Sequence, residues 1–351
     1  MTSTGGKLVD AQRLVRRETA AARAAPTPAR RVARAMAVTL FATAALLPLA
    51  GSDFHTRLAI EAALLGMLAL SVDILLGRVG LLSLGQAAFF GIGAYTAALS
   101  WQHVSQSLWV VLLCVLACTT LVALAVGAVA IRSSGVYFAL ITFGVGEILA
   151  KSANNTAAVG GSDGLLGLPV PALHLPGITL SLADNTTFLY LALTMLLGTW
   201  LLVQRLLDTP FGSVLEALRH NPARVPYLGY GPFGYKLAAF VLAANVAALG
   251  GMLYPFLRGF VSPVLFGFEY STKAVVMALV GGLGSLIGPV VGAAVITFSE
   301  DALSNVTRHP LFAIGALFVG FVLFAPAGMA GALRQLSTRS RRTGKDDGGH
   351  A

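Results

Sequence analysis

The sequence predicts an all-α membrane protein, a polytopic bundle of eight to ten transmembrane helices with both termini in the cytoplasm. Of its 351 residues, 56% are hydrophobic and 11% are charged, and the mean hydropathy is +0.79. A soluble domain of ordinary composition carries about 25% charged residues. The apolar residues also form continuous runs of about 20, the length that spans a hydrocarbon core of about 30 Å. A transmembrane β-barrel would show short alternating segments instead.

Charge at the two ends of the chain sets the predicted orientation. Residues 1–34 carry eight basic and two acidic side chains, and residues 334–351 carry five and two, so the ends hold the whole net charge of +9. Because cytoplasmic flanks retain Lys and Arg, both ends are predicted to be cytoplasmic. We expect a disordered basic leader over 1–34, a transmembrane domain over 35–333 and a basic tail over 334–351, with both ends near membrane lipid. No nucleic-acid recognition motif accompanies them, so no nucleic-acid partner is expected.

Hydropathy divides the chain into apolar segments of spanning length. These are 35–51, 58–77, 81–100, 108–131, 135–152, 187–204, 237–257, 273–298 and 311–331. Two cytoplasmic ends require an even number of crossings, so one segment must be split, re-entrant or wrongly assigned. We expect this to be 273–298, because GGLGSLIGP interrupts it with glycines and a proline.

Two polar stretches are long enough to lie outside the membrane. Residues 154–187 lack a helical period and are rich in turn-forming residues, which predicts an external loop. Residues 205–236 carry several basic side chains, which predicts a cytoplasmic loop. Within it, Ser213 can cap one short helix, and Asn221 with Pro222 can begin a second. The result is either a rigid knob that docks a partner or an ordinary connecting loop.

Small residues recur at helical spacing, which predicts close helix packing. Gly284, Gly288 and Gly292 are four residues apart, and Gly91 closes a similar row within 80–98. Rows of small residues let the backbones of two helices pack closely, which favours helix association in lipid, where the hydrophobic effect does not drive it. A phosphate-binding loop is not supported, because no Lys-Ser/Thr pair ends these glycine-rich stretches.

Four ionisable side chains fall inside apolar segments, where each costs about 2.5–3.5 kcal/mol at a helix centre. They are Glu61, Asp73, Glu147 and Lys273. Asp73 and Lys273 lie near the ends of their segments, so their side chains can reach the membrane interface. Glu147 is more interior and can pair with Lys151 at i+4. The histidines are scattered without ligand spacing, so no metal site is expected. No nucleophile with a partnered base is present either, and no catalytic residue is predicted.

Six stretches, in order, carry a family resemblance. They are LLGRVGLLSLGQAAFFGIGAYTAA (75–98), SSGVYFALITFGVGEIL (133–149), GGSDGLLGLP (160–169), FGSVLEALRHNPARVPYLGY (211–230), LVGGLGSLIGPVVGA (279–293) and LFAPAGMAGAL (323–333). Together they resemble the LivM-like permease subunits of bacterial ABC importers for branched-chain amino acids.

The resemblance implies a non-enzymatic, multi-pass subunit of the bacterial inner membrane that translocates branched-chain or related amino acids. It also implies an external solute-binding protein, a second, LivH-like permease and two cytoplasmic ATPase subunits. ATP would bind these partner subunits, and no cofactor is expected on this chain. Pairing with a second copy instead of a different permease stays open. The stretch 211–230 then resembles the coupling loop that contacts the ATPase, through Glu216, Ala217, Arg219 and Gly229.

The resemblance also places Asp73 where the family more usually carries Asn, and we expect a local pair with Arg78. For the transport pathway we choose polar groups on segments rich in small residues. They are Ser83, Gln86, Tyr95, Tyr137, Thr142 and Glu147. Two alternative functions stay open: a permease for urea or short amides, and a proton-coupled secondary transporter with Glu147 as the proton carrier.

Overall fold

A computed structural model describes residues 28–50, 52–167, 172–175, 178–181, 184–306 and 315. The helices are α2 (Pro28–Leu46), α3 (Asp53–Val72), α4 (Gln86–His103), α5 (Leu108–Ala130), α6 (Val136–Asn155), α7 (Asn185–Leu207), α8 (Pro210–His220), α9 (Pro232–Arg258), α10 (Phe268–Gly281) and α11 (Gly288–Val306). Within the described residues, five helical stretches are long and apolar enough to cross a membrane: Asp53–Val79, Leu108–Ala130, Val136–Asn155, Asn185–Leu207 and Pro232–Arg258. The chain is therefore a mainly helical, multi-pass protein.

Helix α2 begins at Pro28, earlier than the predicted start at residue 35. Proline suits the first turn of a helix, and the Ala- and Arg-rich sequence that follows has high helix propensity. Residues 1–27 of the predicted leader lie outside the described residues. The same holds for the tail 334–351 and, apart from residue 315, for the predicted span 311–331.

Helix α3 lies at the centre of the bundle. It contacts α7, α9, α10 and α11, and most of its residues are buried. A helix that is apolar on all sides is buried on all sides, as the sequence of this one requires. The helix continues as a π-helical segment, η2 (Asp73–Val79), which ends at Gly80 with φ +80°.

Helices α4 and α9 pack with their backbones almost touching. A Cβ at Gly93 would lie 2.2 Å from the carbonyl oxygen of Ala248, and one at Gly251 would lie 1.9 Å from that of Phe90. No side chain fits at either position. Small residues thus bring together two helices that are far apart in sequence.

Replacing Gly251 with alanine is therefore expected to destabilise the protein, because overpacking a rigid contact costs typically about 1–3 kcal/mol. Gly198 in α7 is the matched control, since a Cβ there meets no atom within 4 Å. Thermal unfolding of the purified protein in detergent should show a lower midpoint for Gly251→Ala and no decrease for Gly198→Ala. Equal midpoints for the two variants would contradict the packing described here.

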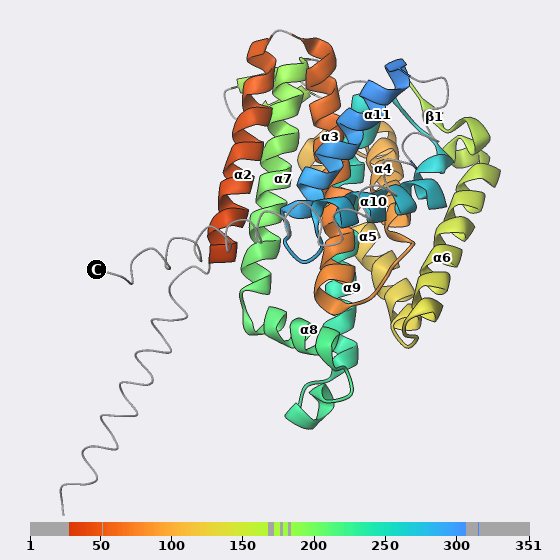
Figure 1. The fold of residues 1–351 in the computed structure, drawn as a ribbon. Coiled ribbons are helices and arrows are strands. Elements are labelled where there is room, and N and C mark those ends of the chain that lie inside the picture. Colours follow the sequence, from red (N-terminus) through yellow and green to blue (C-terminus); the bar gives the residue numbers. More distant parts are fainter. Residues whose placement is uncertain are drawn as a thin grey trace, which may run out of the picture.

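The predicted segment 273–298 forms two helices, so the expectation that it is interrupted is confirmed. Helix α10 contains 14 residues, and α11 starts at Gly288. The linker between them has positive φ at Gly282, Gly284 and Leu286. Figure 1 shows α10 running across the long helices instead of along them.

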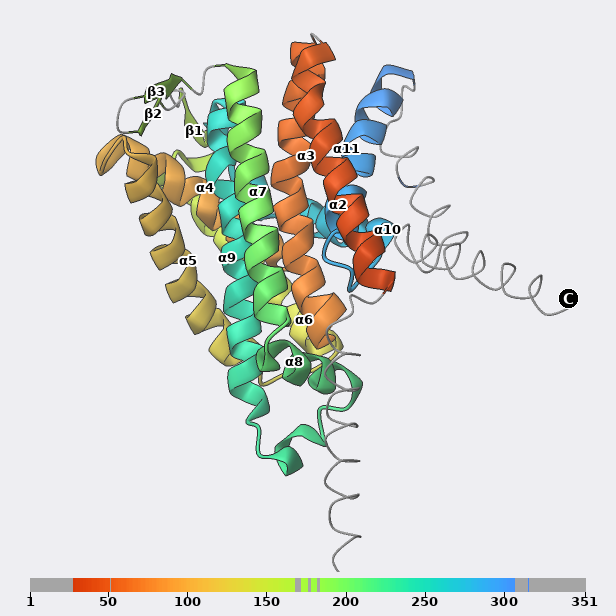
Figure 2. The ribbon, with the colours of Figure 1, turned by 90° about the vertical axis from the view of Figure 1, so that its left-hand side faces the viewer.

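The two long polar segments lie at opposite ends of the bundle (Figure 2). One end carries α8 and the loop after it, and we call it the knob end. The other, the strand end, carries two small antiparallel sheets that the all-α prediction did not include. Strand β1 (Leu165–Leu166) pairs with β4 (Phe260–Val261), and β2 (Ala172–Leu175) pairs with β3 (Ile178–Ser181). The first pair joins the loop before α7 to the end of α9.

Candidate functional site: the knob and the unwound segment

The knob, residues 208–231, is built from α8 and a 3₁₀ turn, η5 (Val225–Leu228). Helix α8 begins at Pro210, so the prediction that Ser213 caps it is wrong: Pro210 already favours a helical first turn. The second short helix predicted at Asn221 is reduced to η5. Helix α8 buries Val214, Leu215 and Leu218 against the bundle, and η5 ends at Gly229 with φ +82°.

The tip of the knob exposes large apolar side chains. Tyr227 is 90% exposed and Leu228 is 70% exposed, which is unusual for residues of this size. A cleft of about 640 Å³ lies beside them, lined by Ser213, Ala217 and Tyr230 among others. Exposed apolar groups beside a cleft are typical of a protein contact surface.

The predicted coupling residues do not share one surface. Glu216 is exposed on the outer side of α8, Ala217 lines the cleft and Gly229 ends η5. Arg219 belongs to the same helix, but its Nη1 donates a hydrogen bond inward, to the carbonyl oxygen of Gly77 in η2. The roles proposed for these residues in ATPase contact stay predictions.

The opening of the family-like stretch 80–98 is unwound. Helix α4 begins only at Gln86, so the predicted span 81–100 starts too early. Side chains of other helices hold this segment and the first turn of α4: Thr142 Oγ1 in α6 accepts from the N–H of Leu84 at 3.2 Å, and Ser271 Oγ in α10 accepts from that of Ala87 at 3.2 Å. These bonds replace those that a longer helix would make.

Four predicted pathway residues lie buried around this segment or further along α4: Ser83, Gln86, Tyr95 and Thr142. Ser83 Oγ accepts from Gln86 Nε2 at 3.4 Å. Gln86 Oε1 and the Tyr95 hydroxyl have no hydrogen-bond partner within the described residues. Buried polar atoms are normally satisfied, so both atoms are available to a water molecule or a polar solute.

The other two predicted pathway residues, Tyr137 and Glu147, lie apart from these on α6. Tyr137 is 74% exposed, and Glu147 is half-buried near the middle of the helix. Across the described part of the chain, Glu147 makes no ion pair, so the predicted pair with Lys151 is wrong. Lys151 is exposed one turn before the end of α6, where water can solvate it.

Three further acidic or basic side chains that the sequence places inside apolar segments, Glu61, Lys273 and Asp73, find partners within the chain. Glu61 pairs with Arg258 at 2.6 Å, and Lys273 pairs with Glu300. Asp73 is fully buried, and its carboxylate accepts from backbone N–H groups of the linker between α10 and α11 instead of pairing with Arg78. That local pairing is thus another prediction that the structure corrects.

The predicted packing glycines divide into two kinds. A Cβ at Gly91 would lie 2.6 Å from the Phe266 ring, one at Gly288 would lie 2.5 Å from the Gly281 carbonyl oxygen, and one at Gly292 would lie 2.0 Å from that of Met277, so no side chain fits at these three positions. Gly284 differs, because it lies in the linker with φ +78°. The row is therefore not one helical face, since α11 begins only at Gly288.

Comparison with known proteins decides the family. Residues 55–331 match the model of the permease component of the branched-chain amino acid transport system. The chain belongs to this family.

It is 30% identical to the high-affinity branched-chain amino acid transport system permease protein LivM of Salmonella typhimurium over 78% of this chain and 69% of that protein. The LivM of Escherichia coli is 30% identical over 75% and 67%, respectively. The autoinducer 2 import system permease protein LsrC of Klebsiella pneumoniae is 31% identical over 44% of each chain. No solved structure matches significantly.

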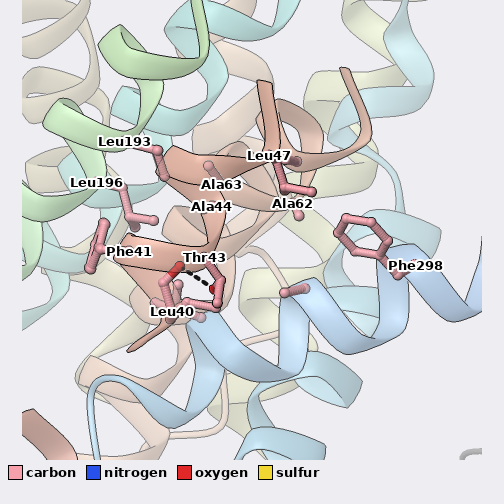
Figure 3. A pocket seen from close by; sticks show the side chains of 13 residues that line it. Leu40, Phe41, Thr43, Ala44, Leu47, Ala62, Ala63, Leu193, Leu196 and Phe298 are labelled. Atoms are coloured by element: carbon pink, nitrogen blue, oxygen red, sulfur yellow. Dashed lines mark hydrogen bonds between the residues drawn. The ribbon is translucent and has the colours of Figure 1, made fainter. Parts of the chain in front are cut away.

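This family member is a membrane permease subunit, and one of its cavities is unsuited to a polar solute. A pocket of about 220 Å³ lies between α2, α3, α7 and α11 (Figure 3). Thr43 is the polar residue in its lining, and its hydroxyl already donates to the carbonyl of Thr39 at 2.8 Å. A zwitterionic amino acid there would lose its hydration without gaining hydrogen bonds.

The sequence did not indicate Ser271 as a site residue, and it did not indicate that Asp73 binds the linker between α10 and α11. Both act on backbone groups about 200 positions away in sequence, at Ala87 and at Gly284 and Leu286. The partial signal was a carboxylate inside an apolar segment, which has to find partners. Within the described residues, no group of three or more His, Cys, Asp or Glu side chains could hold a metal ion.

Proposed function

We propose that this chain is one permease subunit of an ATP-driven importer in the bacterial inner membrane, and that leucine, isoleucine and valine are its solutes. The names of the LivM relatives support this class of solute. An external binding protein would deliver the amino acid, a second permease would complete the pathway, and two ATPase subunits would supply the energy.

The observation that carries the proposal is the outward face of α6. Tyr137, Leu140 and Ile148 are exposed on it, and Gly144 leaves an open space between them. Glu147 lies on the same side, because residues three and four apart are neighbours on a helix. A charged side chain facing lipid near mid-span would cost at least about 2.5 kcal/mol. This supports a partner permease on this face, where water or the partner's polar groups would solvate Glu147.

The knob supports the assignment of the energy source to partner chains. It projects from one end of the bundle (Figure 1) and exposes Tyr227, a residue type enriched at interface hot spots, next to the apolar Leu228. The basic residues of 205–236 support a cytoplasmic position for it by the charge rule. ATPase subunits would dock there, and the strand end would face the external binding protein.

The proposal is tested by uptake of labelled leucine into cells that express this chain with its neighbouring transport genes. We expect uptake that unlabelled isoleucine and valine compete away, that urea does not affect, and that is lost when this chain alone is omitted. Depleting ATP should stop it, whereas a protonophore under conditions that keep ATP constant should not. Uptake of urea instead of leucine would overturn the proposed class of solute. Loss of uptake with the protonophore alone would overturn ATP as the proposed energy source.

A further inference from the structure

We propose that Arg219 and Asp73 link the knob to the linker between α10 and α11, and so transmit ATPase movement to the unwound segment at 80–85. This inference rests on the proposed function. Both are positioning residues in this proposal: they would act on other parts of the chain and not on the solute.

The first link joins α8 to the end of α3. Arg219 reaches out of α8 and donates to the carbonyl oxygen of Gly77 in η2. The last carbonyls of a helix lack partners within it and carry partial negative charge, so a guanidinium binds them well. The Arg219 side chain also lies over Gly80, where a Cβ would be 3.3 Å from its Cγ. A displacement of α8 therefore pulls directly on η2.

The second link joins η2 to the linker. Asp73 Oδ1 accepts from the N–H of Gly284, and Oδ2 accepts from that of Leu286 at 3.0 Å. Gly77 makes room for this, because a Cβ there would lie 2.1 Å from Oδ1 and 2.7 Å from the Gly284 nitrogen. Leu286 is the single non-glycine residue with positive φ in the described part of the chain. The carboxylate thus holds a conformation that leucine rarely adopts.

The third link joins the linker to the predicted pathway. The linker fixes the end of α10, and Ser271 on α10 accepts from the N–H of Ala87 at the start of α4. The unwound segment immediately before it carries Ser83, and Gln86 begins the helix. The route from the knob to these buried polar groups is therefore continuous.

The geometry of the route favours movement as a unit. Charge-assisted hydrogen bonds make the first two links, and these are stronger than neutral ones. The linker itself, with Gly282 and Gly284 at positive φ, can absorb a change in angle between α10 and α11. A continuous chain of contacts does not by itself show energetic coupling between the knob and the pathway, so the first test measures how much leucine is imported for each ATP hydrolysed.

The first test compares Arg219→Met with Arg219→Lys in the complete reconstituted complex. Methionine keeps an unbranched apolar stem but has no donor, whereas lysine can still donate to the Gly77 carbonyl. We expect Arg219→Met to lower the leucine imported per ATP hydrolysed by about tenfold, within the range usual for coupling between sites, and Arg219→Lys to retain most of it. Asp73→Ala, which removes both acceptor oxygens, should lower the same ratio. A purely structural role would reduce complex yield, uptake and ATP hydrolysis together and leave the ratio unchanged.

The second test does not depend on the solute. Hydrogen exchange of residues 282–287 is measured in the complex with and without vanadate-trapped nucleotide. We expect nucleotide to change exchange there in the native complex, and Arg219→Met to remove that change while α8 still responds. An unchanged linker in the native complex, or a full response in Arg219→Met, would overturn the link. If leucine does not enter at all but the linker responds, the proposed solute fails and the link stands.

Discussion

Replacing Gly144 with tryptophan is expected to abolish import while leaving this chain folded. Gly144 lies on the outward face of α6, and a Cβ there meets no atom within 4 Å, so the chain itself has room for a large side chain. If a second permease covers this face, the indole would hold the two subunits apart. Uptake should fall by at least about tenfold, since every 1.4 kcal/mol of lost association is tenfold in affinity.

Gly198→Trp is the matched control. Gly198 is also a helical glycine with open space around it, on α7, where neighbouring leucines are exposed. Both variants should reach the membrane with the same thermal stability, but only Gly144→Trp should fail to co-purify a tagged second permease. Normal uptake and co-purification with Gly144→Trp would show that α6 faces lipid, and would leave Glu147 without an explanation.

Charging the tip of the knob should have an effect of similar or larger size. The double change Tyr227→Asp, Leu228→Asp places two carboxylates where the exposed apolar side chains lie. Loss of a single interface hot spot costs about 2 kcal/mol or more, which is about thirtyfold in affinity, so ATP-dependent uptake should fall by about thirtyfold or more. Because both side chains are exposed in this chain, the bundle should remain folded and inserted.

The conservative pair Tyr227→Phe, Leu228→Met keeps the apolar surface and should retain uptake. Co-purification of the ATPase with each variant gives the direct measurement. If the aspartate variant still binds ATPase and imports leucine normally, the knob is an ordinary connecting loop, the other interpretation that the sequence allows. The contacts proposed for Glu216 and Ala217 could then be rejected with it.

Polar groups on segments rich in small residues are found in two different places. Thr142, Ser83 and Gln86 come together around one unwound segment. Tyr137 and Glu147 fit the same pattern but lie on the outer face of α6. Composition identifies a segment that avoids lipid, but it does not say whether the segment meets its own chain or a partner.

What the sequence determined by itself was the membrane class, the approximate positions of the long helices and the interruption of the segment 273–298. These follow from local properties: apolar runs of spanning length, and a cluster of glycines that cannot continue a helix. What only the tertiary structure decided was which polar group meets which backbone. Asp73 binds the linker rather than Arg78, and Arg219 turns toward Gly77. Inside a bundle, a charge takes the unsatisfied donors or acceptors that folding brings beside it, and these lie far away in the sequence.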